Sequence, residues 1–392
     1  MNRTTVFKLA TAETLIWAIS FYMFPAMFPY WEQDLGWDKT TLSGAFTMAL
    51  LISAFASPIA GRLIDRGHGR LVLVVSTLLI AGGLLVLSFV SQLWHFYLAW
   101  ALIGVAMAGG LYEACFAFVV WLAGVNAKRF ITTITLVAGF AGAVSFPSVY
   151  WLTELIGWRN CLWVFAGVAV VIILPLFLSL PVKRQAPADS QEHDGHHTIG
   201  QAIRSPLFWL LAIGFSLIGL EHGMIISHLL PILYDRGIAA EHAVFYAACI
   251  GPMQVFGRLV MVVLQRRIDM VIIAMAGSLI MLLAVLALKF SIALTVLALL
   301  FVLLHGSSYG ISSITRPVLT IEFLGSVNFG AISGLIGALY MTMIAIAPLL
   351  AAVIWSTSGY DWVLILSAVI CMISFLCLFA LSRKSMSQVS DR

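Results

Sequence analysis

The sequence contains few charged residues and only one sustained polar stretch. Of its 392 residues, 10% are charged and 62% are hydrophobic, and the mean hydropathy is +1.05. A water-soluble domain carries about 25% charged residues. A chain this apolar must face lipid as well as its own core, which excludes a soluble globular protein. The small positive net charge has a topological explanation, given below, so no nucleic-acid partner is expected.

The sequence also lacks the patterns of disulfide frameworks, cofactor sites and common enzymes. Its five cysteines lie in apolar runs and form no C-x-x-C, so no disulfide framework or metal site is indicated. The motifs G-x-x-x-x-G-K-[ST] and H-E-x-x-H are absent, and we expect no enzyme activity and no cofactor. One polar cluster contains side chains of the kinds that bind metal ions: His193, Asp194, His196 and His197. It has no fixed scaffold to hold them in place, which disfavours a specific metal site.

Twelve apolar segments are long enough to cross a hydrocarbon core of about 30 Å. Their approximate limits are 10–30, 41–61, 71–91, 95–122, 130–152, 160–180, 206–232, 242–264, 270–288, 292–315, 329–354 and 361–381. The basic start and the apolar run after it lack a small-residue cleavage site, so we interpret them as the first span. The polar stretch after the sixth span predicts an N-terminal six-helix bundle over 1–181, a cytoplasmic linker over 182–204 and a second six-helix bundle over 205–392.

The basic residues support this map independently. With both termini in the cytoplasm, sixteen of the 21 Lys and Arg residues fall on the inner side, four fall outside and Arg258 lies within a span. This bias follows the positive-inside rule. We therefore expect a multi-pass protein of the cell membrane with both termini cytoplasmic.

A specific motif follows the second span, in the run G-R-L-I-D-R-G-H-G-R over 61–70. Gly allows close helix approach, and an Asp at a helix end can pair with cytoplasmic Arg residues. The run resembles the loop signature G-x-x-x-D-R-x-G-R of the major facilitator superfamily, and a degenerate counterpart ends the eighth span. The positions that match the signature, which the resemblance makes a gating loop, are Gly61, Asp65, Arg66, Gly69 and Arg70.

A narrower resemblance covers most of the chain. The runs G-W-D-K-T-T-L-S-G-A-F (36–46), L-I-G-W-R (155–159), F-G-R-L (256–259) and E-F-L-G-S-V-N-F-G-A-I-S-G (322–334) resemble the monocarboxylate and oxalate–formate branch. That resemblance implies a twelve-helix fold of two pseudo-symmetric bundles, with helices 1, 4, 7 and 10 around a central cavity. It also implies that Arg258, in helix 8, engages a substrate carboxylate.

Ionisable residues inside the spans are the strongest functional signal. A charge in mid-bilayer costs about 2.5–3.5 kcal/mol on insertion scales, so it persists where it pairs or meets water. Besides Arg258, the candidates are Glu13, Glu113, Glu221, His222 and His305, which fall on the four helices that the resemblance places around the cavity. We interpret Glu221, Glu113 and His305 as candidate proton carriers.

Helical periodicity adds candidate substrate contacts. His305, Ser308, Tyr309, Ser312 and Arg316 recur at steps of three and four, which predicts a polar stripe on one face of helix 10. The first span carries an aromatic stripe. Together these predict a small-ligand site with aromatic walls and few polar groups. The expected substrate-binding residues are Arg258, His305, Tyr309, Tyr112, Trp17, Phe21 and His222.

Structural explanations for these residues stay open. Glu13 lies near the cytoplasmic end of its span, and we expect its side chain to extend to the lipid headgroups. Arg316 fits a positive-inside residue at the cytoplasmic mouth. The buried charges could form a structural ion pair, such as Arg258 with Glu221.

The sequence thus predicts a secondary transporter that moves a small, monocarboxylate-like organic anion by alternating access, with coupling to protons. Its expected partners are the small-molecule substrate, the proton and the lipid bilayer, and the default oligomeric state is a monomer. The alternative is a proton-driven exporter of drugs, toxic compounds or siderophore-like metabolites, which the three buried acids would suit. A transport-inactive receptor on the same fold is a further alternative, although no soluble output domain is evident.

Overall fold

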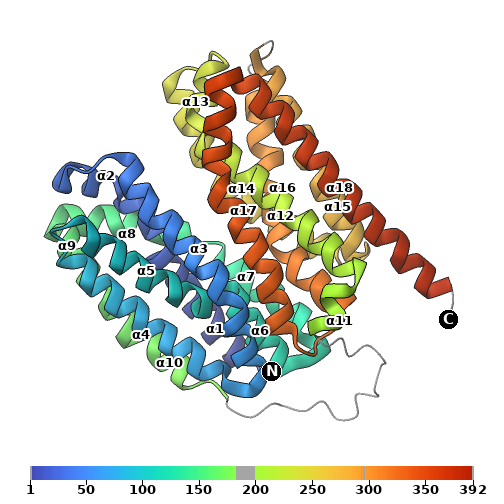
Figure 1. Ribbon diagram of the computed structural model, residues 1–392, viewed down its shortest axis with the longest axis horizontal. Coiled ribbons are helices and arrows are strands. Elements are labelled where there is room, and N and C mark those ends of the chain that lie inside the picture. Colours follow the sequence, from blue (N-terminus) through green and yellow to red (C-terminus); the bar gives the residue numbers. More distant parts are fainter. Residues whose placement is uncertain (1, 182–198, 293, 295, 391–392) are drawn as a thin grey trace. The chain divides into compact units, whose positions relative to one another are not determined.

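A computed structural model describes residues 2–181, 199–292, 294 and 296–390 of the protein (Figure 1). Every regular element in these ranges is helical, which confirms the predicted all-α fold class. The chain divides into two compact units: Met1–Ile199 with Gly325–Ala338, and Gly200–Leu324 with Leu339–Arg392. Most of the expected linker, with its histidines, lies outside the described residues, and the expected bundle boundaries stay a prediction.

The first unit holds the N-terminal helices. They are α1 (Arg3–Ile16), η1 (Trp17–Phe21), α2 (Met23–Leu35), α3 (Lys39–Leu63), η2 (Ile64–His68), α4 (Gly69–Ser88), α5 (Leu93–Gly110), α6 (Tyr112–Ala123), η3 (Gly124–Asn126), α7 (Ala127–Ala138), α8 (Ala141–Ile156), α9 (Trp158–Val168), η4 (Ala169–Ile173) and α10 (Leu174–Leu178). Within this unit α4 packs along α5 and α9 (Figure 1).

The second unit holds the later helices. They are α11 (Ile199–Arg204), α12 (Pro206–Ser227), α13 (Leu229–Asp235), α14 (Ala240–Leu264), α15 (Met270–Lys289), η5 (Phe290–Ile292), α16 (Val296–Leu324), α17 (Phe329–Ser358) and α18 (Tyr360–Ser390). The first residues of α17, up to Ala338, group with the first unit. Inside the second unit α16 packs against both α14 and α15, and α18 packs against α12 and α15.

The helices match the predicted spans. Eleven helical stretches in the described chain are long and apolar enough to cross a membrane. One of them, Thr40–Ser88, is 49 residues long and contains both α3 and α4. Gly67 separates these two helices with a φ of +92°, a conformation that residues with a Cβ rarely adopt. Counting α3 and α4 separately gives the twelve predicted spans.

Several spans are interrupted near their middle. The first changes to a π-helix over Trp17–Phe21 before α2 begins. The span Leu93–Ala123 breaks at Leu111, whose backbone is extended, with φ −89° and ψ −171°. The second break makes Tyr112 and Glu113 the first residues of a new helix, α6, so candidate site residues lie at both interruptions.

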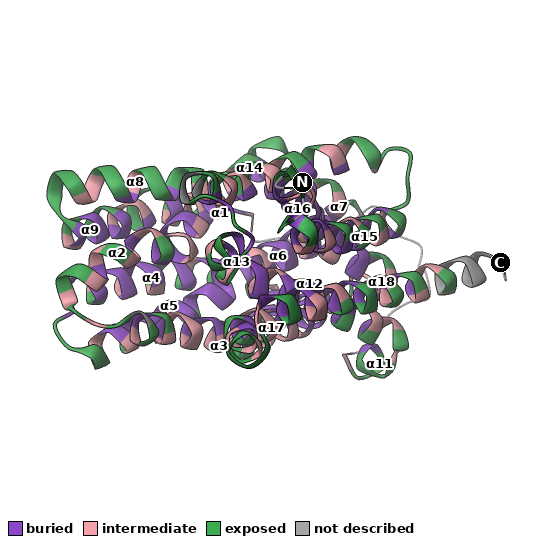
Figure 2. Ribbon diagram, turned by 90° about the horizontal axis from the view of Figure 1, so that it is seen from above, coloured by how far each residue is buried: buried purple, intermediate pink, exposed green. Residues whose placement is uncertain are grey.

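Side-chain exposure separates the helices that face lipid from those inside a unit. In α6 nearly every residue is buried, whereas α8 buries only Ala141, Ser145 and Val149 (Figure 2). Large apolar side chains are widely exposed, for example Leu155 at 76% and Val171 at 73%. Exposed apolar surface on this scale is unfavourable in water and favourable in hydrocarbon. The exposure pattern therefore agrees with a polytopic membrane protein.

Close contact between α14 and α16 fixes the position of the intramembrane arginine. A Cβ added at Gly257 would collide with the backbone carbonyl of Ser307, and one added at Gly310 would collide with that of Gln254. Glycine at these positions lets the two backbones touch, as small residues do in membrane helix pairs. Arg258 follows Gly257 directly, so its side chain starts at this tight crossing.

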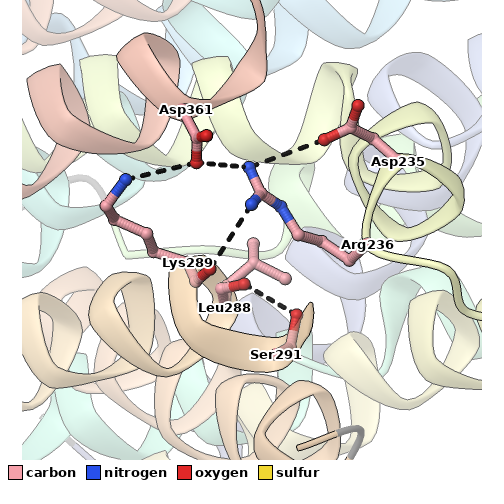
Figure 3. Close-up of polar contacts among 6 residues, drawn as sticks. All are labelled: Asp235, Arg236, Leu288, Lys289, Ser291 and Asp361. Atoms are coloured by element: carbon pink, nitrogen blue, oxygen red, sulfur yellow. Dashed lines mark hydrogen bonds and ion pairs between the residues drawn. The ribbon is translucent and has the colours of Figure 1, made fainter. Parts of the chain in front are cut away.

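A charged cluster joins the ends of three helices in the second unit (Figure 3). The guanidinium of Arg236 is 2% exposed and donates to Asp361 Oδ1 at 2.9 Å. It also lies 3.5 Å from Asp235 and donates to the Lys289 carbonyl. The Lys289 ammonium donates to the same Asp361 oxygen at 3.2 Å. Arg236 thereby ties the end of α13 to the ends of α15 and α18.

Replacing this arginine should loosen the second unit. We expect Arg236→Gln to lower stability by about 1–2 kcal/mol, because charge-assisted bonds are lost while the half-exposed Asp361 limits the penalty. Lys289→Gln, which removes a more exposed interaction, should cost at most about 0.5 kcal/mol. Thermal unfolding in detergent measures both variants, and an unchanged midpoint for Arg236→Gln would contradict the predicted role.

Candidate functional site

A buried acid–histidine pair lies between α12 and α16 of the second unit. His305 Nε2 lies 3.2 Å from Glu221 Oε1, and both side chains have no exposed surface. The contact is close enough for an ion pair, although it does not meet hydrogen-bond geometry. The pair brings together two of the three predicted proton carriers. Glu221 therefore pairs with His305 and does not form the ion pair with Arg258 that the sequence left open.

The polar pair continues into a series of stacked rings. The imidazole of His222 lies parallel to the ring of Tyr309, with centroids 3.4 Å apart, and 5.3 Å from that of His305. The Tyr309 hydroxyl is 2.7 Å from the hydroxyl of Tyr340 on α17. The guanidinium of Arg316 lies 4.2 Å from the Tyr340 ring centroid. The predicted binding residues His222, His305 and Tyr309 therefore form one cluster with Tyr340 and Arg316.

The polar stripe predicted on α16 is only partly directed at this cluster. His305, Tyr309 and Arg316 contact it, as expected. The Ser308 hydroxyl instead donates to the Gly277 carbonyl on α15, and the Ser312 hydroxyl donates to the carbonyl of Tyr309 in its own helix. A hydroxyl without a partner is costly in hydrocarbon, so the nearest carbonyl satisfies each serine.

Arg258 is buried without a carboxylate. The residue is 5% exposed, and its Nε donates to the Ser313 hydroxyl on α16 at 3.2 Å. No acidic side chain in the described ranges forms an ion pair with it. Ser313 lies one turn from both Tyr309 and Arg316, so Arg258 approaches the same face of α16 as the ring cluster. An anion would supply the charge partner that this guanidinium lacks.

In the first unit, the predicted aromatic residues meet at the two span interruptions. The ring of Trp17 lies 5.1 Å from that of Phe21 and 4.7 Å from that of Tyr112, measured between centroids. Glu113 follows Tyr112 in the first turn of α6, where the helix dipole favours a negative charge. The Glu113 side chain packs against Gly337, where an added Cβ would lie 2.8 Å from the Glu113 Cγ. The structure thus groups Trp17, Phe21, Tyr112 and Glu113, which the sequence named separately.

Glu13 corrects an expectation from the sequence. Its side chain was expected to reach the lipid headgroups, but it has no exposed surface. The thiol of Cys115 and the indole of Trp17 are its polar neighbours. Neither carboxylate oxygen makes a hydrogen bond in the described chain. Because α7 and α6 pack against α1, the carboxylate is enclosed by protein rather than directed along the helix to the membrane surface.

The gating-loop motif contacts the start of α17 within the first unit. Asp65 Oδ1 accepts a hydrogen bond from the Gly330 N–H, and Oδ2 accepts one from the Ala331 N–H, both at 2.8 Å. These amides belong to the first turn of α17, where backbone donors have no intrahelical partner. Burial raises the pKa of Asp65, and the two N–H groups act in the opposite direction. Asp65 therefore caps a helix, whereas the sequence suggested pairing with arginines.

The other motif residues support this contact. A Cβ added at Gly61 would collide with the Gly330 carbonyl, and one added at Gly69 would press on the ring of Phe118. Arg70 donates weakly to the carbonyls of Leu178, the last residue of α10, and Leu180, just beyond it. Arg66 is exposed. The glycines permit close packing, and the two arginines do not contact Asp65.

Comparison with protein families identifies the fold family. The model of the Major Facilitator Superfamily matches residues 14–346, which is most of the chain. The chain belongs to the Major Facilitator Superfamily. The family and the twelve-helix fold indicate a transporter rather than an enzyme, and members bind small-molecule substrates.

Curated relatives of this facilitator carry different names. It is 26% identical over 339 residues to the transcription regulatory protein OpdE of Pseudomonas aeruginosa, a match that covers 85% of this chain and 81% of that protein. It is 24% identical over 193 residues to the purine ribonucleoside efflux pump NepI of Escherichia coli, covering 49% of this chain and 48% of the pump. It is 25% identical over 224 residues to human monocarboxylate transporter 11, covering 55% and 45%. The last two matches span less than half of each relative.

Solved structures show the same fold. The facilitator superposes on the fucose:proton symporter FucP of Escherichia coli with a TM-score of 0.74 and 16% sequence identity, over 96% of this chain and 98% of that one. A second FucP structure, in the outward conformation, gives a TM-score of 0.71 at 14% identity. At this level of identity the similarity concerns the fold alone.

Several residues of these clusters escaped the sequence analysis. Tyr340 and Ser313 are single polar residues inside apolar spans, and such residues have no periodic signal of their own. The partners of Asp65 are backbone amides, which residue identity does not reveal. The run over 322–334 was noted for its resemblance, and its glycines gave the available signal for close packing near Gly330.

Removing the cap should expose the start of α17 in this facilitator. We expect Asp65→Ala to accelerate amide hydrogen exchange at Gly330 and Ala331 about fivefold, because a lost helix cap costs about 1 kcal/mol and these amides have no other acceptor. Mass spectrometry of peptides covering 325–338 measures the change.

A matched control is available in α15. Asp269 is the N-cap residue of that helix but makes no side-chain capping bond. Asp269→Ala should therefore leave exchange at the start of α15 unchanged. Equal exchange at 330–331 in Asp65→Ala and the unmodified protein would show that the carboxylate does not protect these amides.

Proposed function

We propose that this facilitator transports a small organic anion, monocarboxylate-like in chemistry, by alternating access coupled to protons. The observation that carries the proposal is Arg258, which is buried in a span with a hydroxyl partner and no carboxylate among the described residues. Insertion of such a charge costs about 2.5–3.5 kcal/mol without compensation. A substrate carboxylate supplies that compensation through charge-assisted hydrogen bonds from the guanidinium.

The Glu221–His305 pair is the proposed proton carrier. A carboxylate and an imidazole 3.2 Å apart can share or exchange one proton. Because both side chains are completely buried, a change in the charge of the pair changes the stability of the helix packing around it. Both residues lie on the helices that build the ring cluster. Protonation of the pair would therefore change the polarity beside His222 and Tyr309, which couples proton binding to substrate binding. Glu113 is the proposed secondary carrier in the first unit.

The proposal includes topology and assembly. The bias of the basic residues favours cytoplasmic termini in a cell membrane. The motif contact at Asp65 would act as a gate, since it joins α17 to the loop between α3 and α4 and can open without breaking a covalent restraint. A monomer suffices for this mechanism.

A second candidate function rests on a different observation. Glu13 is buried with both oxygens lacking hydrogen bonds, and Glu113 lies nearby on α6. Two buried acids in the first unit suit a proton-driven exporter of cationic or neutral compounds, and one relative is named as an efflux pump. In this alternative the cargo or a proton, rather than Arg258, balances the acidic residues.

Loss of the arginine should abolish anion transport. We expect Arg258→Gln to reduce uptake of labelled lactate into proteoliposomes at least about tenfold, because a truncated charge partner of a carboxylate costs about 2 kcal/mol or more. Arg266→Gln, which changes an exposed arginine near the end of the same helix, is the matched control and should retain uptake. Movement of a cationic dye such as ethidium, insensitive to Arg258 and lost in Glu113→Gln, would instead establish the exporter.

Neutralising the acid of the buried pair should separate transport from the proton gradient. We expect Glu221→Gln to remove the pH dependence of net uptake while substrate exchange continues, because the amide resembles the protonated acid and cannot release a proton. Uptake and counterflow across pH 5.5–8 in proteoliposomes test this. Glu154→Gln changes an exposed acid and should behave like the unmodified protein. Persistence of full pH dependence in Glu221→Gln would exclude Glu221 as the carrier.

A further inference from the structure

Four aromatic side chains of the first unit form a partly exposed surface. We call Trp17, Phe21, Tyr22 and Tyr112 the aromatic surface. Trp17 contacts each of the other three, with ring centroids 5.1, 6.1 and 4.7 Å away, respectively. All four are only partly buried. Their rings lie at tilted or edge-to-face angles, which are arrangements that aromatic pairs prefer.

This surface differs from the aromatic core beside it. Phe24 and Phe46 stack at 4.3 Å, and Trp31 and Trp100 pack around them with no exposed surface. Those core rings fill the interior between α2, α3 and α5. The aromatic surface continues from this core through the contact of Phe21 with Phe46, at 5.4 Å. The core can therefore hold the surface rings in place while leaving part of them uncovered.

The backbone beneath the aromatic surface is unusual. Trp17–Phe21 is a π-helix, in which the Tyr22 N–H donates to the Trp17 carbonyl at 3.0 Å. The Ser145 hydroxyl of α8 donates to the Ala18 carbonyl within this turn at 2.7 Å. π-Helical turns inside α-helices are rare and are frequent at functional sites. Here the turn brings Trp17 and Tyr22 close enough to contact.

The position of these residues along their spans excludes an aromatic belt. Trp17 is the fifteenth residue of the 33-residue stretch Arg3–Leu35, and Tyr112 is the twentieth of the 31-residue stretch Leu93–Ala123. Trp and Tyr that anchor a protein in lipid gather at the two ends of a span. An indole N–H or a phenol in mid-bilayer needs protein, water or a ligand around it. The exposed part of this surface is therefore suited to a ligand path rather than to lipid.

Polar groups also lie beside the aromatic surface. The Trp17 Nε1–H is buried, and the fully buried carboxylate of Glu13, one turn away, has the Trp17 indole and the Cys115 thiol as its polar neighbours. These groups lie against one another beneath the rings rather than on the exposed surface.

We infer that the aromatic surface binds a planar ring, so that the transported substrate is an aromatic or heteroaromatic compound, and a carboxylate if the proposed function holds. The anionic part of this inference rests on the proposed function, whereas the ring part rests on the aromatic surface alone. Stacking against Trp and Tyr favours a flat π-system over a puckered aliphatic ring of equal size, by about fivefold in affinity.

A pair of ligands with the same carboxylate and the same ring size tests the inference. Benzoate is planar and cyclohexanecarboxylate is puckered, and isothermal titration of the purified full-length protein compares their affinities. We expect benzoate to bind about fivefold more tightly. Trp17→Leu should bring the two affinities together, whereas Trp17→Phe, which keeps a ring, should preserve the preference. Trp151→Leu, a change of an exposed tryptophan in α8, should have no effect.

The outcomes separate the ring inference from the proposed function. Equal affinities for both carboxylates, or a benzoate preference that survives Trp17→Leu, would overturn the ring inference. If both affinities also fall in Arg258→Gln, the proposed anion transport stands without it. Conversely, binding of neutral inosine that depends on Trp17, with no binding of either carboxylate, would support the ring site and overturn the anion proposal. Thermal unfolding of Trp17→Leu and Trp17→Phe establishes that both variants are folded.

Discussion

Hydrocarbon cannot solvate a charge, and this constraint explains the placement of almost every ionisable group inside the spans. Glu221 lies against His305, so each limits the cost of burying the other. Arg236 and Asp361 form an ion pair at the helix ends, where the partial exposure of Asp361 further reduces the free-energy cost of burying the charges. Arg258 departs from this pattern, because a serine hydroxyl cannot neutralise a guanidinium. An uncompensated charge is retained in such an environment when a ligand completes it.

The constraint applies equally to the backbone. Interrupting a helix inside a membrane frees carbonyl and amide groups, which then need other partners. The π-helix at Trp17–Phe21 keeps its backbone bonded through the Tyr22 amide and receives the Ser145 hydroxyl from α8. At the start of α17, the carboxylate of Asp65 accepts two free amides. The interruptions with supporting contacts are therefore the places where residues proposed for binding and gating occur.

The sequence predicted the parts of the fold that depend on composition and local pattern. Apolar length located all twelve spans, and the ordered spacing over 61–70 located the loop that caps α17. Patterns on one helix could not predict contacts between helices. Ser308 lies on the predicted stripe but bonds to Gly277 of α15, and His222 stacks on Tyr309 although helical phase rotates it away from Glu221. Glu13 lies near the end of its span in the sequence, yet neighbouring helices enclose it.

Gly257 and Gly310 illustrate why such contacts decide the site. Without a side chain at either position, α14 and α16 approach until backbone meets backbone. This approach leaves Arg258 little freedom and places its Nε against Ser313, on the face of α16 that also carries Tyr309 and Arg316. A cation held in one orientation loses little conformational entropy when an anion binds, so the tight crossing suits the anion-binding role proposed for the guanidinium. The aromatic surface of the first unit is held in place in a comparable way, by the packed rings of Phe24, Phe46 and Trp100. Each unit therefore keeps its functional candidates in place through interhelical packing, around a cation in the second unit and around rings in the first.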